Sequence, residues 1–263
     1  MKKQEKKLIY KPFAKGKVLT KQALKKALRI FLLLLIAVIF YLFTGQLLVM
    51  TGGVLRIILS TLLIGLVMGL FYYEGAAQGE EDVSLGEIIY SKREEGQHIN
   101  SEDSNNCYHP LKGFASAFLG VLPIFIIALI FSFIAQKQVY QLGVLPSWLT
   151  AFDRHRNIEI ALSYYKETSS IGLEGTLRIV IRMLLFPFVH FFGAENPDNM
   201  LLMERLSPLL SLIVPSAYAI GYLSGPKRRA EVHGDIATGK TKNAKKARRE
   251  RIKRQKGGDG RIV

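Results

Sequence analysis

Long uncharged apolar runs alternate with strongly polar stretches along the chain. Charged residues are absent from residues 30–50, 113–136 and 206–226, and residues 54–73 carry only Arg56, near one end. About 20 apolar residues in a helix cross the roughly 30 Å hydrocarbon core of a bilayer. The pattern therefore predicts an all-α, polytopic helical membrane bundle with four clear spans.

A fifth apolar segment, residues 173–193, contains Arg178 and Arg182. Its Leu, Ile, Val and Phe residues favour insertion by about 5 kcal/mol, whereas an arginine near the centre opposes it by about 3 kcal/mol. Pro187 and His190 add to the opposing side, so the sum is near zero. We expect neighbouring helices to decide whether this segment crosses.

The segment at 139–170 is the second uncertain part of the bundle. Its apolar run, 139–152, has only 14 residues and is interrupted by Gly143 and Pro146. This length suits a re-entrant or interfacial insertion better than a full span. A short amphipathic helix is expected to follow it.

The number of crossings is constrained by the charge of the two ends. Residues 1–29 hold eleven Lys/Arg and one acidic residue, and residues 225–263 hold fourteen and four. Basic segments that flank membrane helices stay cytoplasmic, so both termini are expected there and an odd number of crossings is disfavoured. Six crossings are favoured because they place Arg154 and Arg156 inside; four remain the alternative.

The chain is predicted to divide into five regions. The order is a basic cytoplasmic N-terminal arm (1–29), a hairpin of two spans (30–73), an acidic polar loop (74–112), further membrane helices containing the 139–170 insertion (113–225), and a basic cytoplasmic tail (226–263). The first span follows a long basic stretch and lacks a usual cleavage site, which indicates an uncleaved signal anchor in the plasma membrane.

The two arms are predicted to be disordered and to bind polyanions. The tail has few apolar residues and no aromatic residue after position 239, so it can neither insert as an amphipathic helix nor stack on bases. Anionic lipid headgroups, or nucleic acid such as that of a ribosome, remain as partners, and the acidic loop is a possible internal competitor. The residues expected to bind are Lys240, Lys242, Lys245, Lys246, Arg248, Arg249, Arg251, Lys253 and Arg254.

Arg178, Arg182 and His190 are the candidate site inside the membrane. Ionisable residues at this depth often mark a binding site, here one for an anion or a lipid headgroup. The alternative is structural: Arg178 snorkels to the headgroups, and one buried arginine is satisfied by carbonyls or Glu174. Because the clear spans contain no Asp or Glu, an ion-coupled carrier is disfavoured.

Small residues at a spacing of four predict close helix packing, either within the bundle or between two copies of the chain. These residues are Thr61, Gly65 and Gly69 in the second span, and Ala217 and Gly221 in the last.

The other motifs in the sequence are weak evidence for a catalytic or metal-binding site. Residues 234–241 match the phosphate-loop pattern, but no α/β domain surrounds them. His98, Cys107 and His109 are a weak metal signal, and a single cysteine excludes an internal disulfide. No catalytic motif and no cofactor site is expected. The sequence thus favours a non-enzymatic scaffold or accessory subunit, which can pair with a membrane protein or with itself. A small permease or lipid-handling protein is the alternative.

Overall fold

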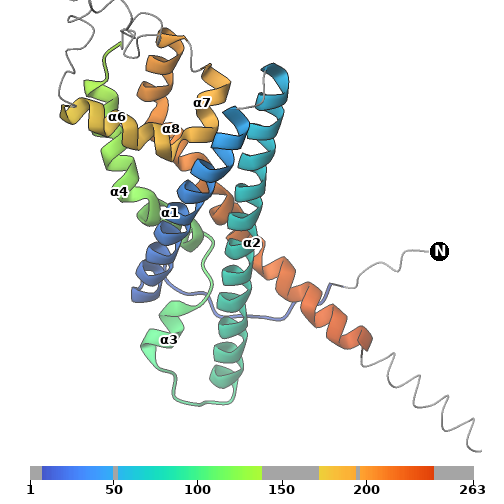
Figure 1. The fold of residues 1–263 in the computed structure, drawn as a ribbon. Helices are drawn as coiled ribbons and strands as arrows, with labels where there is room; N and C mark the ends of the chain where they lie inside the picture. The colour runs from blue at the N-terminus through green and yellow to red at the C-terminus, as the bar shows by residue number, and fades with distance from the viewer. Residues whose placement is uncertain (1–7, 50–52, 138–171, 194–195, 240–263) are drawn as a thin grey trace, which may run out of the picture. The chain divides into compact units, whose positions relative to one another are not determined.

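The computed structural model describes residues 8–49, 53–137, 172–193 and 196–239, and the described part is all-helical (Figure 1). The insertion predicted at 139–170 and the nine tail residues expected to bind polyanions lie outside the described residues. The helices are α1 (Lys21–Val49), α2 (Gly53–Glu94), α3 (Ser101–Asn106), α4 (Lys112–Ile134), α6 (Leu173–Leu184), α7 (Phe186–Phe192) and α8 (Pro197–Leu223).

Among the described residues, α1, α2, α4 and α8 are long and apolar enough to cross a membrane. They correspond to the four predicted spans, which confirms the predicted fold class. Helices of this kind indicate a multi-pass membrane protein. The chain divides into two compact units: residues 1–25, 70–117 and 216–263 form unit 1, and residues 26–69 and 118–215 form unit 2.

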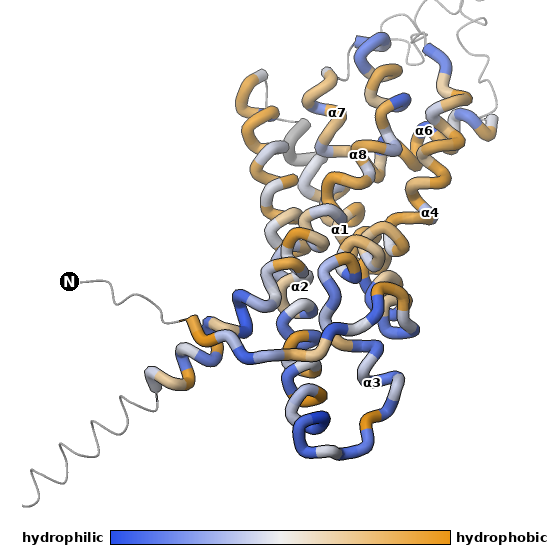
Figure 2. The backbone as a smooth tube through the Cα atoms, turned by 180° about the vertical axis from the view of Figure 1, so that it is seen from behind, coloured by the Kyte–Doolittle hydropathy of each residue, from blue (hydrophilic) through white to orange (hydrophobic). Residues whose placement is uncertain are grey.

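The prediction of an acidic loop after residue 73 is wrong for its first part, because α2 continues to Glu94. The colour along α2 changes from hydrophobic to mixed and hydrophilic (Figure 2). Residues 75, 76, 79, 82, 83, 86 and 89 are all buried, which is a helical period. Most of them are glycine, alanine or aspartate, so hydrophobicity alone does not reveal the helix.

The described part of the N-terminal arm, from residue 8, packs within unit 1. Backbone hydrogen bonds join Ile9 N–H to the carbonyl of Ala230, Ala14 N–H to that of Gly86, and Gly16 N–H to that of Tyr108. The end of the arm, from Lys21 onward, is helical and forms the start of α1. Thr20 caps it, since its Oγ1 accepts a hydrogen bond from Ala23 N–H at 3.2 Å.

Residues 225–239, at the beginning of the basic tail, are helical, and the stretch for which disorder is argued, 240–256, lies outside the described residues. Salt bridges hold this helix against α2 within unit 1: Arg228 to Glu80 at 3.1 Å and Arg229 to Glu87 at 3.0 Å. The acidic segment is therefore an internal partner for the beginning of the tail.

Unit 2 has an apolar core built from α2, α4, α6 and α7. Its buried members are Ile64, Ala128, Phe131, Ala135, Ile181, Leu185 and Phe188. Segment 173–193 does not form one straight helix, since α6 and α7 meet at 93°. Pro187 lacks the N–H that would continue the hydrogen bonds of α6, which explains a break at this point. The pair therefore has the form of a broken span or a re-entrant loop.

Candidate functional site: a buried arginine–glutamate network

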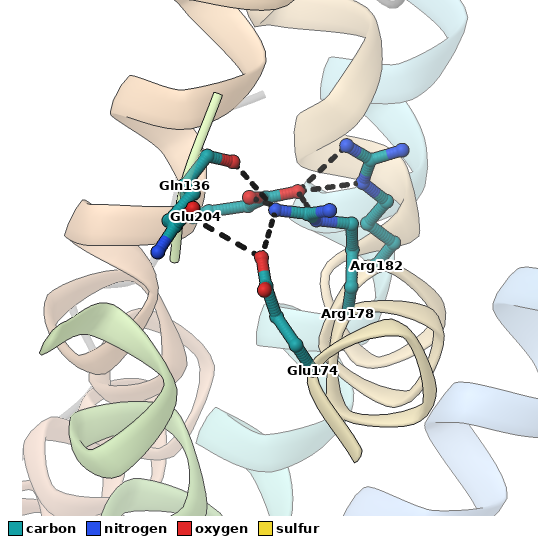
Figure 3. A network of polar contacts seen from close by, with 5 residues as sticks. All are labelled: Gln136, Glu174, Arg178, Arg182 and Glu204. Carbon is teal, nitrogen blue, oxygen red and sulfur yellow. Dashed lines mark hydrogen bonds and ion pairs between the residues drawn. The ribbon is translucent and has the colours of Figure 1, made fainter. Parts of the chain in front are cut away.

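Helices α6 and α8 of unit 2 bring four charged side chains together. Glu174, Arg178 and Arg182 are one turn apart on α6, so they share a face of that helix. Glu204 comes from α8, which begins at Pro197 after a cap by Asn196, whose Oδ1 accepts from Asp198 N–H at 3.0 Å. We call these four residues, with the backbone of Gln136, the Arg–Glu network (Figure 3).

Glu204 is the centre of the network and only 1 % exposed. Arg178 Nε donates to both its carboxylate oxygens, at 3.1 and 3.2 Å. Arg182 donates to Oε1 from Nε at 2.9 Å and approaches it with Nη2 at 2.6 Å. One carboxylate thus accepts from two guanidinium groups, which are the side chains best shaped for such bonds.

Arg178 has further partners in this network besides Glu204. Its Nη2 donates to the carbonyl of Gln136 at 2.6 Å and to Glu174 at 2.8 Å. Gln136 N–H in turn donates to Glu174 at 3.4 Å. The network therefore joins the residues just after α4 to both α6 and α8.

Two predictions about this site are wrong. Arg178 does not snorkel: it is 8 % exposed, and of the two arginines it is the more buried and the more connected. The four spans are also not free of acids, because α8 starts nine residues before the predicted span and includes Glu204. The expectation of one buried arginine satisfied by a carbonyl and Glu174 describes Arg178, although it did not include Glu204.

The outer face of α6 is apolar while its inner face is charged. Leu173, Ile179, Val180 and Met183 are exposed, whereas Arg178 is buried. An amphipathic helix at a water surface shows the opposite distribution. Charges that face the bundle interior and apolar residues that face outward are typical of a helix surrounded by lipid.

His190 does not share the surroundings of the two arginines. It lies on α7, beyond the bend, and packs edge-on against the ring of Phe186 at 5.4 Å between centroids. The side chain is 9 % exposed, and neither ring nitrogen has a hydrogen-bond partner among the described residues. The expected cluster of three cations is therefore reduced to two.

The charge balance of the Arg–Glu network determines what it can do. Two arginines face two glutamates, and Nε and Nη2 of Arg178 donate to protein acceptors. A site that attracts an anion needs excess positive charge or free donors. The network instead has the composition of an internal tie between helices.

Unit 1 contains a second buried charge cluster, formed by Asp82, Lys112 and Tyr222 and called here the Asp82 cluster. Lys112 Nζ lies 3.0 Å from Asp82 Oδ2 and donates to the carbonyls of Asn106 and Cys107 at 2.6 and 3.4 Å. Tyr222 donates its hydroxyl to the same Asp82 oxygen at 2.5 Å. No sequence motif predicts this cluster, since Asp82 and Tyr222 are 140 positions apart.

Burial raises the pKa of two groups beside the Asp82 cluster, the Tyr108 hydroxyl and the Cys107 thiol. Tyr108 stacks on Tyr222 with centroids 5.3 Å apart, and burial raises the pKa of the Tyr108 hydroxyl. Burial likewise raises the pKa of the Cys107 thiol, an effect that the nearby positive charge of Lys112 opposes. A buried thiol held mainly in its neutral form reacts slowly, so Cys107 can report on the opening of unit 1.

The predicted packing residues differ in their surroundings. A side chain added at Gly221 would meet the backbone of Tyr72, so α8 packs closely on α2 within unit 1. An added Cβ at Gly65 or Gly69 would meet nothing within 4 Å, and Thr61 is exposed. Ala217 is buried.

Two sequence motifs remain, the phosphate-loop match and the possible metal ligands. Neither has the structure of a working site in the described residues. Residues 234–239, the described part of the phosphate-loop match, are helical. Over the described ranges, no three His, Cys, Asp or Glu residues are arranged to hold a metal ion. Comparisons with protein-family models, with curated proteins and with solved structures find no match for this chain.

Proposed function

We propose that this protein is a membrane-embedded scaffold that holds a polyanionic partner at the cytoplasmic face by its basic arms. The observation that carries the proposal is the attachment of the tail. Two of the first three basic residues of the tail are paired with acids of α2, namely Arg228 with Glu80 and Arg229 with Glu87. The base of the tail, residues 225–239, is thereby held against α2 within unit 1.

The charge beyond this base is not balanced by its own sequence. Residues 240–263 contain eleven Lys/Arg and two acidic residues. A dense cationic segment attached to a fixed point attracts lipid headgroups or a nucleic-acid backbone by electrostatics, with little dependence on sequence.

Contacts within unit 1 support placing both arms on one side of the membrane. Ile9 and Ala230 share a backbone hydrogen bond, and so do Ala14 and Gly86. Segments joined in this way lie on the same side, so the chain must cross an even number of times between them. A re-entrant α6–α7 pair alongside four crossings satisfies this condition, as does a sixth crossing.

The rival function, an anion permease that uses Arg178 and Arg182, loses its basis in the Arg–Glu network. Both arginines are bound to Glu204, and Glu174 balances the second charge. The scaffold function therefore rests on the arms and treats the network as structural support.

The test uses the full chain in nanodiscs of neutral lipid, titrated with duplex RNA at increasing salt. We expect binding at low salt that weakens about a thousandfold or more between roughly 50 and 200 mM salt, because several counterions are released. Adding anionic lipid to the nanodisc should compete if headgroups are the preferred polyanion. Binding that persists unchanged at high salt would contradict the proposal.

A matched pair of variants isolates charge from sequence. Replacing the nine predicted tail residues with glutamine should abolish binding, while scrambling the order of residues 240–256 should preserve it. Loss of binding in the scrambled chain would indicate a shaped site instead of an electrostatic arm.

A further inference from the structure

A polar groove of about 500 Å³ lies in unit 1, between the start of α1 and the short helix α3. Lys17, Lys21 and Lys25 line one wall, and Glu102 and Asp103 line the other. The groove is thus divided into a cationic and an anionic side. A ligand that carries only one sign of charge would be attracted by one wall and repelled by the other.

The position of the groove along α1 relates it to the membrane. Lys25 is five residues before Ile30, where the apolar run of α1 begins, which corresponds to about 7.5 Å of helix. This is the depth of lipid headgroups next to the hydrocarbon core. Leu19, which also lines the groove, is 68 % exposed, and Leu24 is 61 % exposed, so apolar surface continues from the groove along α1.

The two walls are already linked by one ion pair. Lys21 Nζ lies 3.7 Å from Glu102 Oε1, and both side chains are largely exposed, at 90 % and 70 %. A zwitterionic ligand can replace this pair without leaving either charge alone, since its anion takes the place of Glu102 and its cation that of Lys21. An exposed ion pair of this kind contributes little stability, so breaking it costs little.

We propose that this groove binds the phosphoethanolamine headgroup of a phospholipid. The phosphate lies against Lys17, Lys21 and Lys25, and the primary ammonium donates to Glu102 and Asp103. A phosphatidylcholine headgroup has no N–H to donate, and a phosphatidylglycerol headgroup has no cation, so both bind less well. The site contains no residue of the tail; its lysines belong to the N-terminal arm.

The experiment is native mass spectrometry of the full chain released from nanodiscs that contain equal amounts of phosphatidylethanolamine, phosphatidylcholine and phosphatidylglycerol. We expect retained phosphatidylethanolamine to exceed each of the others by about tenfold, the effect of one or two charge-assisted hydrogen bonds. Equal retention of the three lipids would overturn the proposal. Soluble phosphoethanolamine, added as a competitor, should displace the lipid only weakly if the acyl chains contribute along Leu19 and Leu24. Full displacement would assign the site to a free headgroup compound instead.

Three variants separate headgroup recognition from net charge. Glu102→Gln with Asp103→Asn should remove the preference for phosphatidylethanolamine over phosphatidylglycerol, and Lys17→Gln with Lys21→Gln should lower retention of all three lipids. Lys11→Gln with Lys15→Gln removes the same charge from exposed positions outside the groove and should change neither. An equal loss in this control would refute a specific site. Because the altered side chains are at the surface, the variants should keep the thermal unfolding midpoint of the parent chain.

Discussion

The Asp82 cluster of unit 1 and the Arg–Glu network of unit 2 both bury balanced charges, but they distribute them differently. In unit 1 the ammonium of Lys112 faces a carboxylate, and its other donors are directed at backbone carbonyls. In unit 2 two guanidinium groups share Glu204. A change at one residue should therefore have different consequences in the two units.

The surroundings of the two clusters also differ. Basic and acidic segments pack together in unit 1, through Arg228 and Arg229 on α2. In unit 2 the exposed face of α6 is apolar. The buried charges therefore lie near paired basic and acidic segments in unit 1, and beneath an exposed apolar helix face in unit 2.

The largest effect is expected for Lys112→Met. Lys112 is fully buried, and its loss removes the ammonium that neutralises Asp82. Removing one partner of a buried ion pair lowers the free energy of unfolding by about 3–5 kcal/mol, because the other charge is left buried and unpaired. The measurement is the rate of maleimide labelling of Cys107, the single cysteine of the chain, across a denaturant series.

Two controls accompany this variant. Lys15→Met removes an exposed lysine from the same unit and should change the free energy of unfolding by less than about 0.5 kcal/mol. Asp82→Asn combined with Lys112→Met removes both charges and should recover part of the loss. If Lys112→Met labels no faster than the parent chain, the Asp82 cluster does not hold unit 1 together.

The next effect separates the two arginines of unit 2. Arg178→Gln should lower the free energy of unfolding by about 3 kcal/mol, because Glu174 and the Gln136 carbonyl lose their donor. Arg182→Gln should lower it by about 1 kcal/mol, because Glu204 keeps Arg178. Thermal unfolding in detergent measures both, with the exposed Arg205→Gln as control. A larger effect at Arg182 would reverse the hierarchy that the structure gives.

The sequence predicts the membrane spans but not the acidic residue at the centre of the Arg–Glu network. The four spans could be predicted because uncharged apolar runs of about 20 residues match the thickness of a bilayer and are uncommon elsewhere. Glu204 could not, because it lies beside Arg205 just before the apolar run, where charges normally face water. The available signal was helical spacing: Met200, Met203, Glu204 and Ser207 are all buried and share one face of α8.

The second half of α2, from residue 74 to Glu94, was not predicted to be helical for a related reason. Its buried face carries Gly75, Gly79 and Asp82 in place of large apolar residues. Such a face packs by close backbone approach and by an ion pair, neither of which raises hydrophobicity. Contacts that depend on a distant partner, such as Tyr222 on Asp82, are not encoded in any local pattern.

The third prediction tests whether each unit faces lipid or water. One isoleucine of similar exposure in each unit is replaced by aspartate. Ile179 on α6 is 49 % exposed and Ile88 on α2 is 53 % exposed. Ile179→Asp should oppose membrane insertion by about 2.5–3.5 kcal/mol, the value for aspartate in lipid. Ile88→Asp should be nearly neutral if unit 1 faces water.

The measurement for this pair is the amount of each variant in the membrane fraction, followed by its thermal unfolding midpoint. Equal tolerance of the two changes would mean that α6 is not surrounded by lipid. Equal damage would mean that the outer face of α2 at Ile88 is covered.

The smallest effect compares two glycines of α2, one in each unit. A Cβ at Gly75 would meet the carbonyl of Tyr218 on α8, so Gly75→Ala forces helices apart and should lower the free energy of unfolding by about 1–3 kcal/mol. Gly65→Ala meets nothing within 4 Å and should be neutral or stabilise α2 by up to about 1 kcal/mol, the difference in helix propensity. Unfolding midpoints measured with light scattering give stability and oligomeric state together. If Gly65→Ala instead destabilises the protein and lowers its mass in solution, a second copy of the chain packs on Thr61, Gly65 and Gly69. The small residues of unit 2 would then serve association between chains, while those of unit 1 serve packing within one.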